Sequence, residues 1–267
     1  MKAMNNDSPL IAFLEDKINQ CSKKQVITFS KFLDMHQRSV AACVKLPQGV
    51  KRFFYGGFDD AERSIAVFLP GYIEVSDEAD LAEYFKTVPE DCPVNVLEVR
   101  KDRFSPALTH RDYLGSLMAL GIERDVTGDI LVNDGGCHIA VMKNIAGYIK
   151  ENLGTAGRGT LEIEFFEPYE VESVRTESGT DESFTVSSPR LDSMVKNGFG
   201  VSREGAADAI LHGLVFVNDI ECLKPDKKIN EGDKITLRHK GKIVISEFAG
   251  KSRKGKDIVK VKSFVKK

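Results

Sequence analysis

The order of strand-like and helix-like segments between Pro93 and Phe166 constrains the fold of this chain more than any other feature. Strand segments alternate apolar and polar residues, whereas helical segments repeat apolar residues every three or four positions. The expected elements are, in chain order, a strand at 94–99, a helix from Thr109 to Gly121, strands at 129–132 and 137–142, a helix at 144–153 and a strand at 161–166. The order β-α-β-β-α-β is the ferredoxin-like arrangement, which RNA-recognition folds share.

The segment before this pattern is expected to be helical and then to form a hairpin. Apolar residues recur at helical spacing through residues 8–44, where Ser8 and Thr28 are suitable N-caps. The elements expected next are strands at 52–55 and 65–69 around Gly56-Gly57, and a short helix at 78–85. We therefore predict an N-terminal helical and hairpin domain at residues 1–88 and a ferredoxin-like (RRM-like) domain at residues 89–172.

The last part of the chain begins with a polar stretch. Residues 173–188 are rich in Ser, Thr, Glu and Gly and nearly free of apolar side chains, which is typical of a linker. A C-terminal domain at residues 189–267, ending in a basic tail, is expected to follow. The fold class predicted for the whole chain is α+β, in three parts.

The charges are distributed unevenly along the chain. Residues 186–267 hold 18 Lys and Arg against 10 Asp and Glu, a formal net charge of +8, whereas residues 1–185 hold 20 against 30, a net charge of −10. Such asymmetry points to an end that faces nucleic acid. A solvated basic tail would carry the same charges, so charge alone leaves both interpretations open.

Cysteine spacing and hydropathy limit the compartment. The five cysteines, Cys21, Cys43, Cys92, Cys137 and Cys222, lie far apart, so none forms the C-x₂-C pair of a zinc site. An odd number argues against a secreted disulfide framework. No apolar run approaches the roughly 18 residues of a membrane span, and the N-terminus does not read as a signal peptide. We expect a cytoplasmic protein without membrane contact.

A run of residues at fixed spacing occupies most of Arg190 to Ile235. It begins R-L-D at Arg190, continues with Ser202-Arg203 and with A-x-x-x-I-x-x-G-x-V-x-V-N, and ends G-D-x-I. The run resembles the S4 RNA-binding domain. Arg190 and Arg203 stand at the starts of two neighbouring helices, where guanidinium groups and helix amides can both meet phosphate.

The resemblance and the clustered charge predict a set of RNA-binding residues in the C-terminal domain. They are Arg190, Lys196, Ser202, Arg203, Lys227, Lys228, Arg238, Lys240, Lys242, Lys251, Arg253 and Lys254. An ion pair of Arg190 with Asp192 or Glu204 inside the domain is the alternative for Arg190.

Two further runs extend the resemblance over most of the chain. Residues 53–70 read F-F-Y-G-G-F-D-D-A-E-R-x-I-A-V-F-L-P, and residues 108–122 read L-T-H-R-D-Y-L-G-S-L-M-A-L-G-I. Both resemble the YlmH family of bacterial S4-domain proteins. This resemblance implies binding to structured RNA (rRNA and tRNA) on the large ribosomal subunit, in rescue of stalled translation. It implies no cofactor, and it does not imply an oligomer.

The ferredoxin-like domain itself gives mixed signals for RNA. The strands at 94–99 and 137–142 contain no aromatic residue for base stacking, so contacts through loops and helix ends are expected instead. The candidate contacts are His110, Arg111 and Arg158, together with Arg52 and Arg63 on the hairpin. Each could equally be a solvated residue or a local ion-pair partner.

Three motifs imitate catalytic ones and fail on context. His110-Arg111-Asp112 lacks the Asn five residues on that a kinase loop needs, because position 117 is Leu. Arg190-Leu191-Asp192 imitates a pseudouridine synthase motif, but too little chain follows it for a catalytic domain. The Gly-rich residues 154–159 lack the Lys-Ser/Thr of a P-loop. We expect no catalytic residue and no metal, with an RNA-modifying enzyme or a protein-interaction adaptor as the alternatives.

Overall fold

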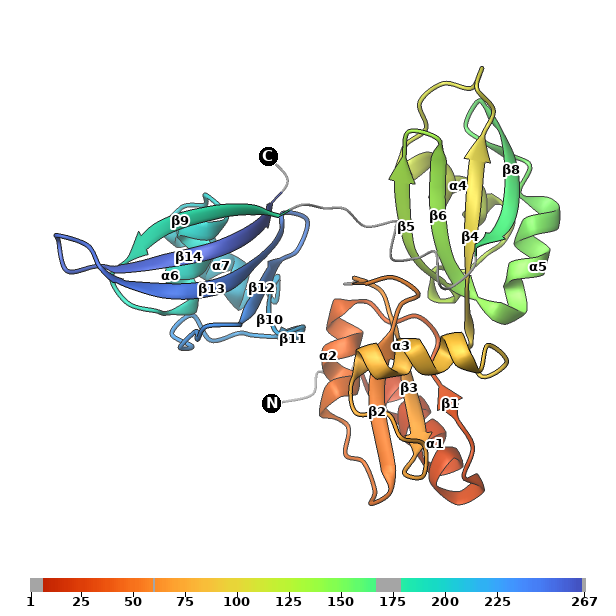
Figure 1. Ribbon diagram of the computed structural model, residues 1–267, viewed down its shortest axis with the longest axis horizontal. Helices are drawn as coiled ribbons and strands as arrows, with labels where there is room; N and C mark the ends of the chain where they lie inside the picture. The colour runs from red at the N-terminus through yellow and green to blue at the C-terminus, as the bar shows by residue number, and fades with distance from the viewer. Residues whose placement is uncertain (1–6, 60, 167–178, 266–267) are drawn as a thin grey trace. The chain divides into compact units, whose positions relative to one another are not determined.

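The computed structural model describes residues 7–59, 61–166 and 179–265, which form two compact units. The N-terminal unit is Met1–Thr176 and the C-terminal unit is Glu177–Lys267 (Figure 1). Among the described residues, no helix combines the length and the apolar character needed to cross a bilayer. All five cysteines are free thiols.

The first part of the N-terminal unit is a small sheet with helices on both faces. The strands β1 (Thr28–Phe29), β3 (Ile65–Pro70) and β2 (Val50–Tyr55) lie in that order, and the helices are α1 (Ser8–Lys24), α2 (Met35–Cys43) and α3 (Glu78–Thr87). The central strand β3 is buried throughout. Ala66 and Phe68 pack with α1, whereas Ile65, Val67 and Leu69 pack on the side of α3. Successive side chains of β3 point to opposite faces of the sheet, so this one strand contributes to two hydrophobic cores.

The helix predicted from Thr28 is wrong. Thr28 and Phe29 pair with β3, and Phe32 and Leu33 are buried in the connection that follows. The helix α2 begins after Asp34, whose side chain accepts a hydrogen bond from the Gln37 amide while the Gln37 side chain accepts one from the Asp34 amide. This reciprocal cap fixes the start of α2. Thr28 has no such partner three residues on, because position 31 is Lys, and the apolar residues Phe32 and Leu33 are buried in the loop that follows it.

The second part of the N-terminal unit has the predicted ferredoxin-like order. Its elements are β4 (Val94–Lys101), α4 (His110–Ala119), the short helix η1 (Arg124–Val126), β5 (Thr127–Asn133), β6 (Gly136–Met142), α5 (Lys143–Asn152), β7 (Thr155–Ala156) and β8 (Gly159–Phe166). The strand order is β5-β6-β4-β8-β7, antiparallel throughout. One face packs on α4 and α5 through a core that includes Leu97, Ile139 and Ile163.

The opposite face of this sheet is partly covered by the first part of the unit. Val96, Ala140 and Met142 pack in one cluster with Phe32 and Phe85. The segments predicted as two domains, 1–88 and 89–172, therefore share a core. Because this end of the sheet is covered, its face is not available for stacking of RNA bases.

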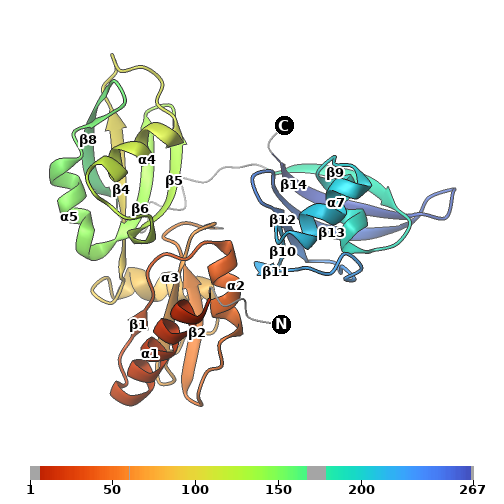
Figure 2. The same ribbon diagram turned by 180° about the vertical axis from the view of Figure 1, so that it is seen from behind.

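The C-terminal unit is a six-stranded sheet with two helices on one face (Figure 2). The strand order is β11-β10-β12-β13-β14-β9. The elements are β9 (Thr180–Val186), α6 (Leu191–Gly198), α7 (Arg203–Leu211), β10 (Val215–Val217), β11 (Ile220–Glu221), β12 (Lys234–Leu237), β13 (Gly241–Lys251) and β14 (Asp257–Val265). Leu191, Met194 and Ile210 from the helices meet Ile243 and Val259 from the sheet in one core.

Two expectations for the ends of this unit are corrected. Residues 173–178 of the predicted linker lie outside the described residues. Most of its described part, 179–188, is strand β9, which pairs with β14 along its whole length. The described part of the basic tail is the hairpin β13–β14. Both segments expose polar side chains on one face of the sheet and turn alternate side chains inward, so that Val186 is buried in β9, Ile243 and Ile245 in β13, and Val259 and Val261 in β14. Pairing between segments distant in sequence makes them strands, although their composition is polar.

Candidate nucleic-acid interface

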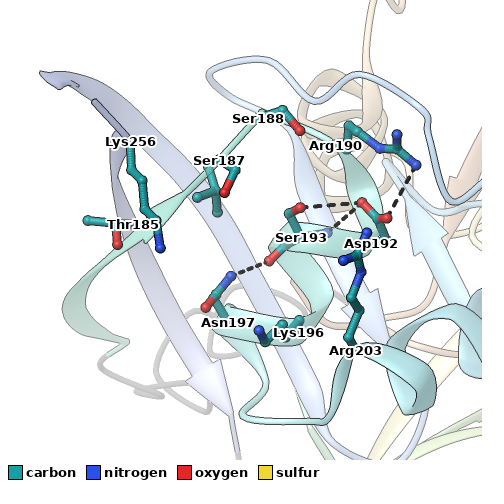
Figure 3. A pocket seen from close by; sticks show the side chains of 11 residues that line it. Thr185, Ser187, Ser188, Arg190, Asp192, Ser193, Lys196, Asn197, Arg203 and Lys256 are labelled. Carbon is teal, nitrogen blue, oxygen red and sulfur yellow. Dashed lines mark hydrogen bonds and ion pairs between the residues drawn. The ribbon is translucent and has the colours of Figure 1, made fainter. Parts of the chain in front are cut away.

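A cavity of about 230 Å³ lies on the helical side of the C-terminal unit (Figure 3). It is bounded by the start of α6, the start of α7 and the end of β9 with the turn before β14. Its lining residues are Thr185, Val186, Ser187, Ser188, Arg190, Asp192, Ser193, Lys196, Asn197, Arg203 and Lys256. We call this cavity the α6–α7 cleft. Nearly all of its side chains are polar, so its ligand must be polar too.

The start of α6 is held by the segment around Lys227 and Lys228. The Leu191 amide donates to the Lys227 carbonyl and the Ile229 amide donates to the Pro189 carbonyl, each at 2.9 Å. Arg190 and Lys228 consequently form an antiparallel bridge. Two predicted RNA-binding positions that are far apart in sequence are thus neighbours beside the cleft.

The start of α7 uses its predicted cap. The Ser202 hydroxyl accepts a hydrogen bond of 2.9 Å from the Gly205 amide, which satisfies one of the free amides of the first turn. The structure therefore assigns the Ser202 hydroxyl a structural role in capping. Arg203 follows as the first helical residue and lines the cleft.

The cleft has an excess of positive charge. Arg190, Lys196, Arg203 and Lys256 are its cations, and Asp192 is its one carboxylate. Asp192 lies 3.3 Å from Arg190, so the ion pair considered as the alternative for Arg190 is present. It does not remove Arg190 from the cleft, because that side chain remains 47% exposed and a guanidinium has five N–H groups. Asp192 orients Arg190, and the cations together favour an anion.

Some predicted residues lie outside the cleft. Lys242 projects from β13 on the face opposite the helices, since its neighbour Ile243 is in the core, and its ammonium lies 4.9 Å from the centre of the Phe264 ring. The remaining predicted cations are exposed at hairpin turns. They are Arg238 and Lys240 between β12 and β13, and Lys251, Arg253 and Lys254 at the end of β13 and in the turn before β14.

Sequence reasoning missed the second wall of the cleft. This wall consists of Lys256 and the hydroxyl-bearing residues Thr185, Ser187 and Ser188. The linker prediction placed the hydroxyl residues outside the domain, and Lys256 was only one of many lysines in a basic run. The signal available in the sequence was the alternation of apolar and polar residues at 257–265. It indicates a strand, and a strand needs a second strand to pair with.

The arginines of the hairpin are not available for RNA, which corrects the expectation for Arg52 and Arg63. The Arg63 guanidinium donates to the carbonyls of Phe32, Arg124 and Thr127. Burial lowers the pKa of Arg63 from its ordinary value, although nearby carboxylates oppose the shift. Arg52 donates to the carbonyls of Ala42 and Val44. Both arginines hold loops of the N-terminal unit together.

The predicted contacts His110, Arg111 and Arg158 are exposed. His110 and Arg111 begin α4, and Arg158 lies in the turn between β7 and β8. A Cβ at Gly157 would lie 3.3 Å from an Asp112 carboxylate oxygen, so the two segments adjoin. The structure thus brings all three residues to one end of the ferredoxin-like sheet.

The uncovered part of that sheet is unsuited to base stacking. Glu98 pairs across the sheet with His138 and with Glu164, and its carboxylate forms a 2.5 Å ion pair with Arg100. Carboxylates in these positions repel phosphate. The described residues contain no group of three or more His, Cys, Asp and Glu arranged to hold a metal ion.

Comparison with known proteins agrees with this architecture. Residues 88–169 match the family model described as "Putative RNA-binding domain in YlmH", and residues 189–235 match the S4 domain. The matches define an S4 domain preceded by a segment similar to the domain described for YlmH. Both matches agree with the resemblance that the motifs indicated.

Individual relatives extend the comparison. The chain is 28% identical over 228 residues to ribosome-associated protein quality control protein P2 of Bacillus subtilis, which covers 84% of this chain and 82% of that protein. It is 34% identical over 101 residues to small ribosomal subunit protein uS4 of Frankia casuarinae, covering 36% of this chain and about half (48%) of that protein. The solved structure of cell division protein ylmH from Streptococcus pneumoniae has the same fold, with a TM-score of 0.50 at 19% identity, over 66% of this chain and 98% of that one.

Proposed function

We propose that this chain is a non-catalytic RNA-binding protein that holds structured rRNA or tRNA in the α6–α7 cleft, on the large ribosomal subunit, during rescue of stalled translation. The observation that carries the proposal is the group of four cations against one carboxylate in this cleft. Arg190 and Arg203 stand where α6 and α7 begin, Lys196 lies in the last turn of α6, and Lys256 precedes β14. Such a site binds a phosphate backbone without changing it. We expect the protein to act in the cytoplasm, where ribosomes are found.

Each side of the cleft has a distinct part in this mechanism. Arg190 and Arg203 offer planar forks for phosphate oxygens at the helix starts, where backbone amides also favour anions. Lys196 and Lys256 add point charges from the two walls. The hydroxyls of Ser187 and Ser188 can meet a ribose 2′-hydroxyl, which distinguishes RNA from DNA. Asp192 keeps Arg190 in place before the RNA arrives.

The ribosomal part of the proposal is supported by the relatives. The Bacillus subtilis protein is named as ribosome-associated and as a quality control protein. The chain is also similar over 101 residues to uS4, a protein named as part of the small ribosomal subunit. The role in quality control on the large subunit rests on the resemblance of residues 53–70 and 108–122 to the YlmH family. The following experiment tests it directly.

The test is sedimentation of the full chain with separated ribosomal subunits. The variant combines Arg190→Ala, Lys196→Ala, Arg203→Ala and Lys256→Ala, and the control replaces four exposed cations of the N-terminal unit that lie in neither proposed RNA site, Lys23, Lys24, Lys31 and Lys45. We expect the cleft variant to stay in the supernatant while the control pellets with the large subunit. Unchanged pelleting of the cleft variant, with a circular dichroism spectrum like that of the wild type, contradicts the proposal.

The same preparation separates the two alternatives. Pelleting that survives ribonuclease treatment favours a protein-interaction adaptor. A modified nucleotide that appears in rRNA or tRNA only when the chain is present favours an RNA-modifying enzyme with an S4 anchor.

A further inference from the structure

Phe104 stands in the connection between β4 and α4 and is 79% exposed, the most exposed large apolar side chain in the described part of the chain. The Arg103 guanidinium lies over its ring, 4.5 Å from the ring centre. A large apolar ring in water is unfavourable for the isolated protein. An exposed aromatic ring with an arginine over it is also the arrangement that base-stacking proteins present to an unpaired nucleotide.

The loop that carries Phe104 is fastened to the sheet. The Asp102 amide donates to the Thr160 carbonyl at 3.0 Å, and the Thr160 amide donates to the Ser105 hydroxyl at 3.1 Å. The Ser105 amide closes a turn onto the Asp102 carbonyl at 2.9 Å. Phe104 is therefore presented by a hydrogen-bonded turn, so less conformational entropy is lost when a base stacks on it.

Cations adjoin this turn on the side of α4 and the β7–β8 turn, although the N-terminal unit is acidic as a whole. Arg158 and the start of α4 with Arg111 adjoin it, because Gly157 lies against Asp112 and Gly159 against Ser105. Asp112 accepts hydrogen bonds from the Thr109 amide and hydroxyl, and these bonds lower the pKa of its carboxyl, with a smaller contribution in the same direction from the Arg111 guanidinium. Asp112 is thus engaged in capping α4.

The remaining charges near the turn lie to one side. Asp102 is in the turn itself, and Lys101 borders the β5–β6 turn, which contributes Asp134, through a hydrogen bond from its amide to the Gly135 carbonyl. These three charges sum to −1. Arg103, Arg111 and Arg158 remain as the cations on the side of α4 and the β7–β8 turn, and no ion pair with a carboxylate is described for any of them among residues 7–59, 61–166 and 179–265.

We propose that this end of the N-terminal unit binds unpaired RNA, with Phe104 stacked on a base and Arg103, Arg111 and Arg158 holding the flanking phosphates. A single ring among arginines offers too little apolar area for a protein partner, whereas one ring is enough for one base. The site is separate from the α6–α7 cleft and does not depend on the function proposed for it. It also explains how a domain with an acidic sheet can bind RNA through its loops.

The experiment uses the absence of tryptophan from the chain. In the full chain, Phe104→Trp introduces a single tryptophan, and Phe165→Trp provides a matched control, because Phe165 is 45% exposed with the Lys150 ammonium 5.0 Å from its ring. The probe is an unstructured RNA oligonucleotide of roughly ten nucleotides, a length that a stacking site of this kind can engage. Stacking should quench the tryptophan emission of the Phe104→Trp variant and leave that of the Phe165→Trp variant unchanged.

Two further variants make the result decisive. Phe104→Leu should weaken oligonucleotide binding roughly tenfold to hundredfold, the effect of losing one base–aromatic stack. Phe165→Leu should leave it unchanged. Quenching at position 104 should persist when Arg190 and Arg203 are replaced by Ala, so this result stands even if the cleft does not bind RNA. Equal quenching at both positions, no quenching at 104, or unchanged affinity of Phe104→Leu would overturn the proposal.

Discussion

Arg190 and Lys228 face one another in an antiparallel bridge, although the helix pair α6–α7 and two strands separate them in sequence. The bridge places a guanidinium that lines the α6–α7 cleft beside a lysine from the segment that precedes β12. An anion bound at the edge of the cleft beside both residues would be stabilised by the two cations together.

Arg190→Ala and Lys228→Ala should therefore each weaken binding of structured RNA at moderate salt. Each should lower the slope of log affinity against log salt concentration by about 1, because each removes about one phosphate contact. Arg190→Ala should be the more damaging, since it leaves Asp192 in the cleft without its cation. Fluorescence anisotropy over a salt series measures both effects. Lys45→Ala, an exposed lysine of the N-terminal unit, should keep the wild-type slope, and a wild-type slope for Arg190→Ala would contradict the cleft as the binding site.

The packing of α6 on the sheet leads to a stability prediction. A Cβ at Gly198 would overlap the Ile243 Cδ1 atom. Gly198→Ala should destabilise the C-terminal unit by about 1–3 kcal/mol, the cost of overpacking a filled core. Hydrogen exchange of the α6 and β13 amides measures this unit by itself. Gly147→Ala in α5 is the matched control. Its Cβ would meet no atom, so the substitution should stabilise the helix by about 0.5–1 kcal/mol, a change in stability opposite in sign to that of Gly198→Ala.

Arg63 links the two parts of the N-terminal unit. Its guanidinium donates to Phe32 in the first part and to Arg124 and Thr127 in the second. Arg63→Ala would leave these carbonyls without a charged donor and should cost about 2–4 kcal/mol. All six tyrosines lie in residues 1–176, so tyrosine fluorescence during urea unfolding reports on this unit. Arg111→Ala should shift the midpoint little, and an Arg63 variant that lost RNA affinity at unchanged stability would reverse this assignment.

The sequence predicted the parts of the fold that local patterns determine. The β-α-β-β-α-β order followed from alternation and from caps such as Thr109, and the start of α7 followed from Ser202. Strand β9 could not be predicted in this way, because it is stabilised by pairing with β14 and not by its own composition. Lys256 was missed for the same reason. Arg63 was misassigned because a surface-type residue in a hairpin gives no local sign of the three carbonyls that surround it.

His138 is the clearest case of a polar group that costs stability. It is 7% exposed, both ring nitrogens lack a hydrogen-bond partner among the described residues, and the ring meets Phe166 edge to face at 4.5 Å between centres. Burial lowers the pKa of His138, with Glu98 opposing the shift and Arg100 adding to it. The folded protein therefore keeps the imidazole neutral at pH values where the unfolded chain, with a pKa of about 6.5, binds a proton.

The sign of the pH dependence follows from this difference. Below about pH 6.5 the unfolded chain gains a proton that the folded chain excludes, so stability falls as the pH falls toward the lowered pKa of the folded state. His138→Leu should remove this part of the decline and should leave stability at pH 7 unchanged or raised by about 1 kcal/mol, because a buried imidazole without partners is replaced by an apolar side chain. Urea unfolding followed by tyrosine fluorescence between about pH 5 and 7.5, a range that brackets the ordinary histidine pKa, measures the slope. Met118→Leu, at an exposed position in α4 of the same unit, should retain the wild-type slope, and an unaltered slope in His138→Leu would show that other groups cause the pH dependence.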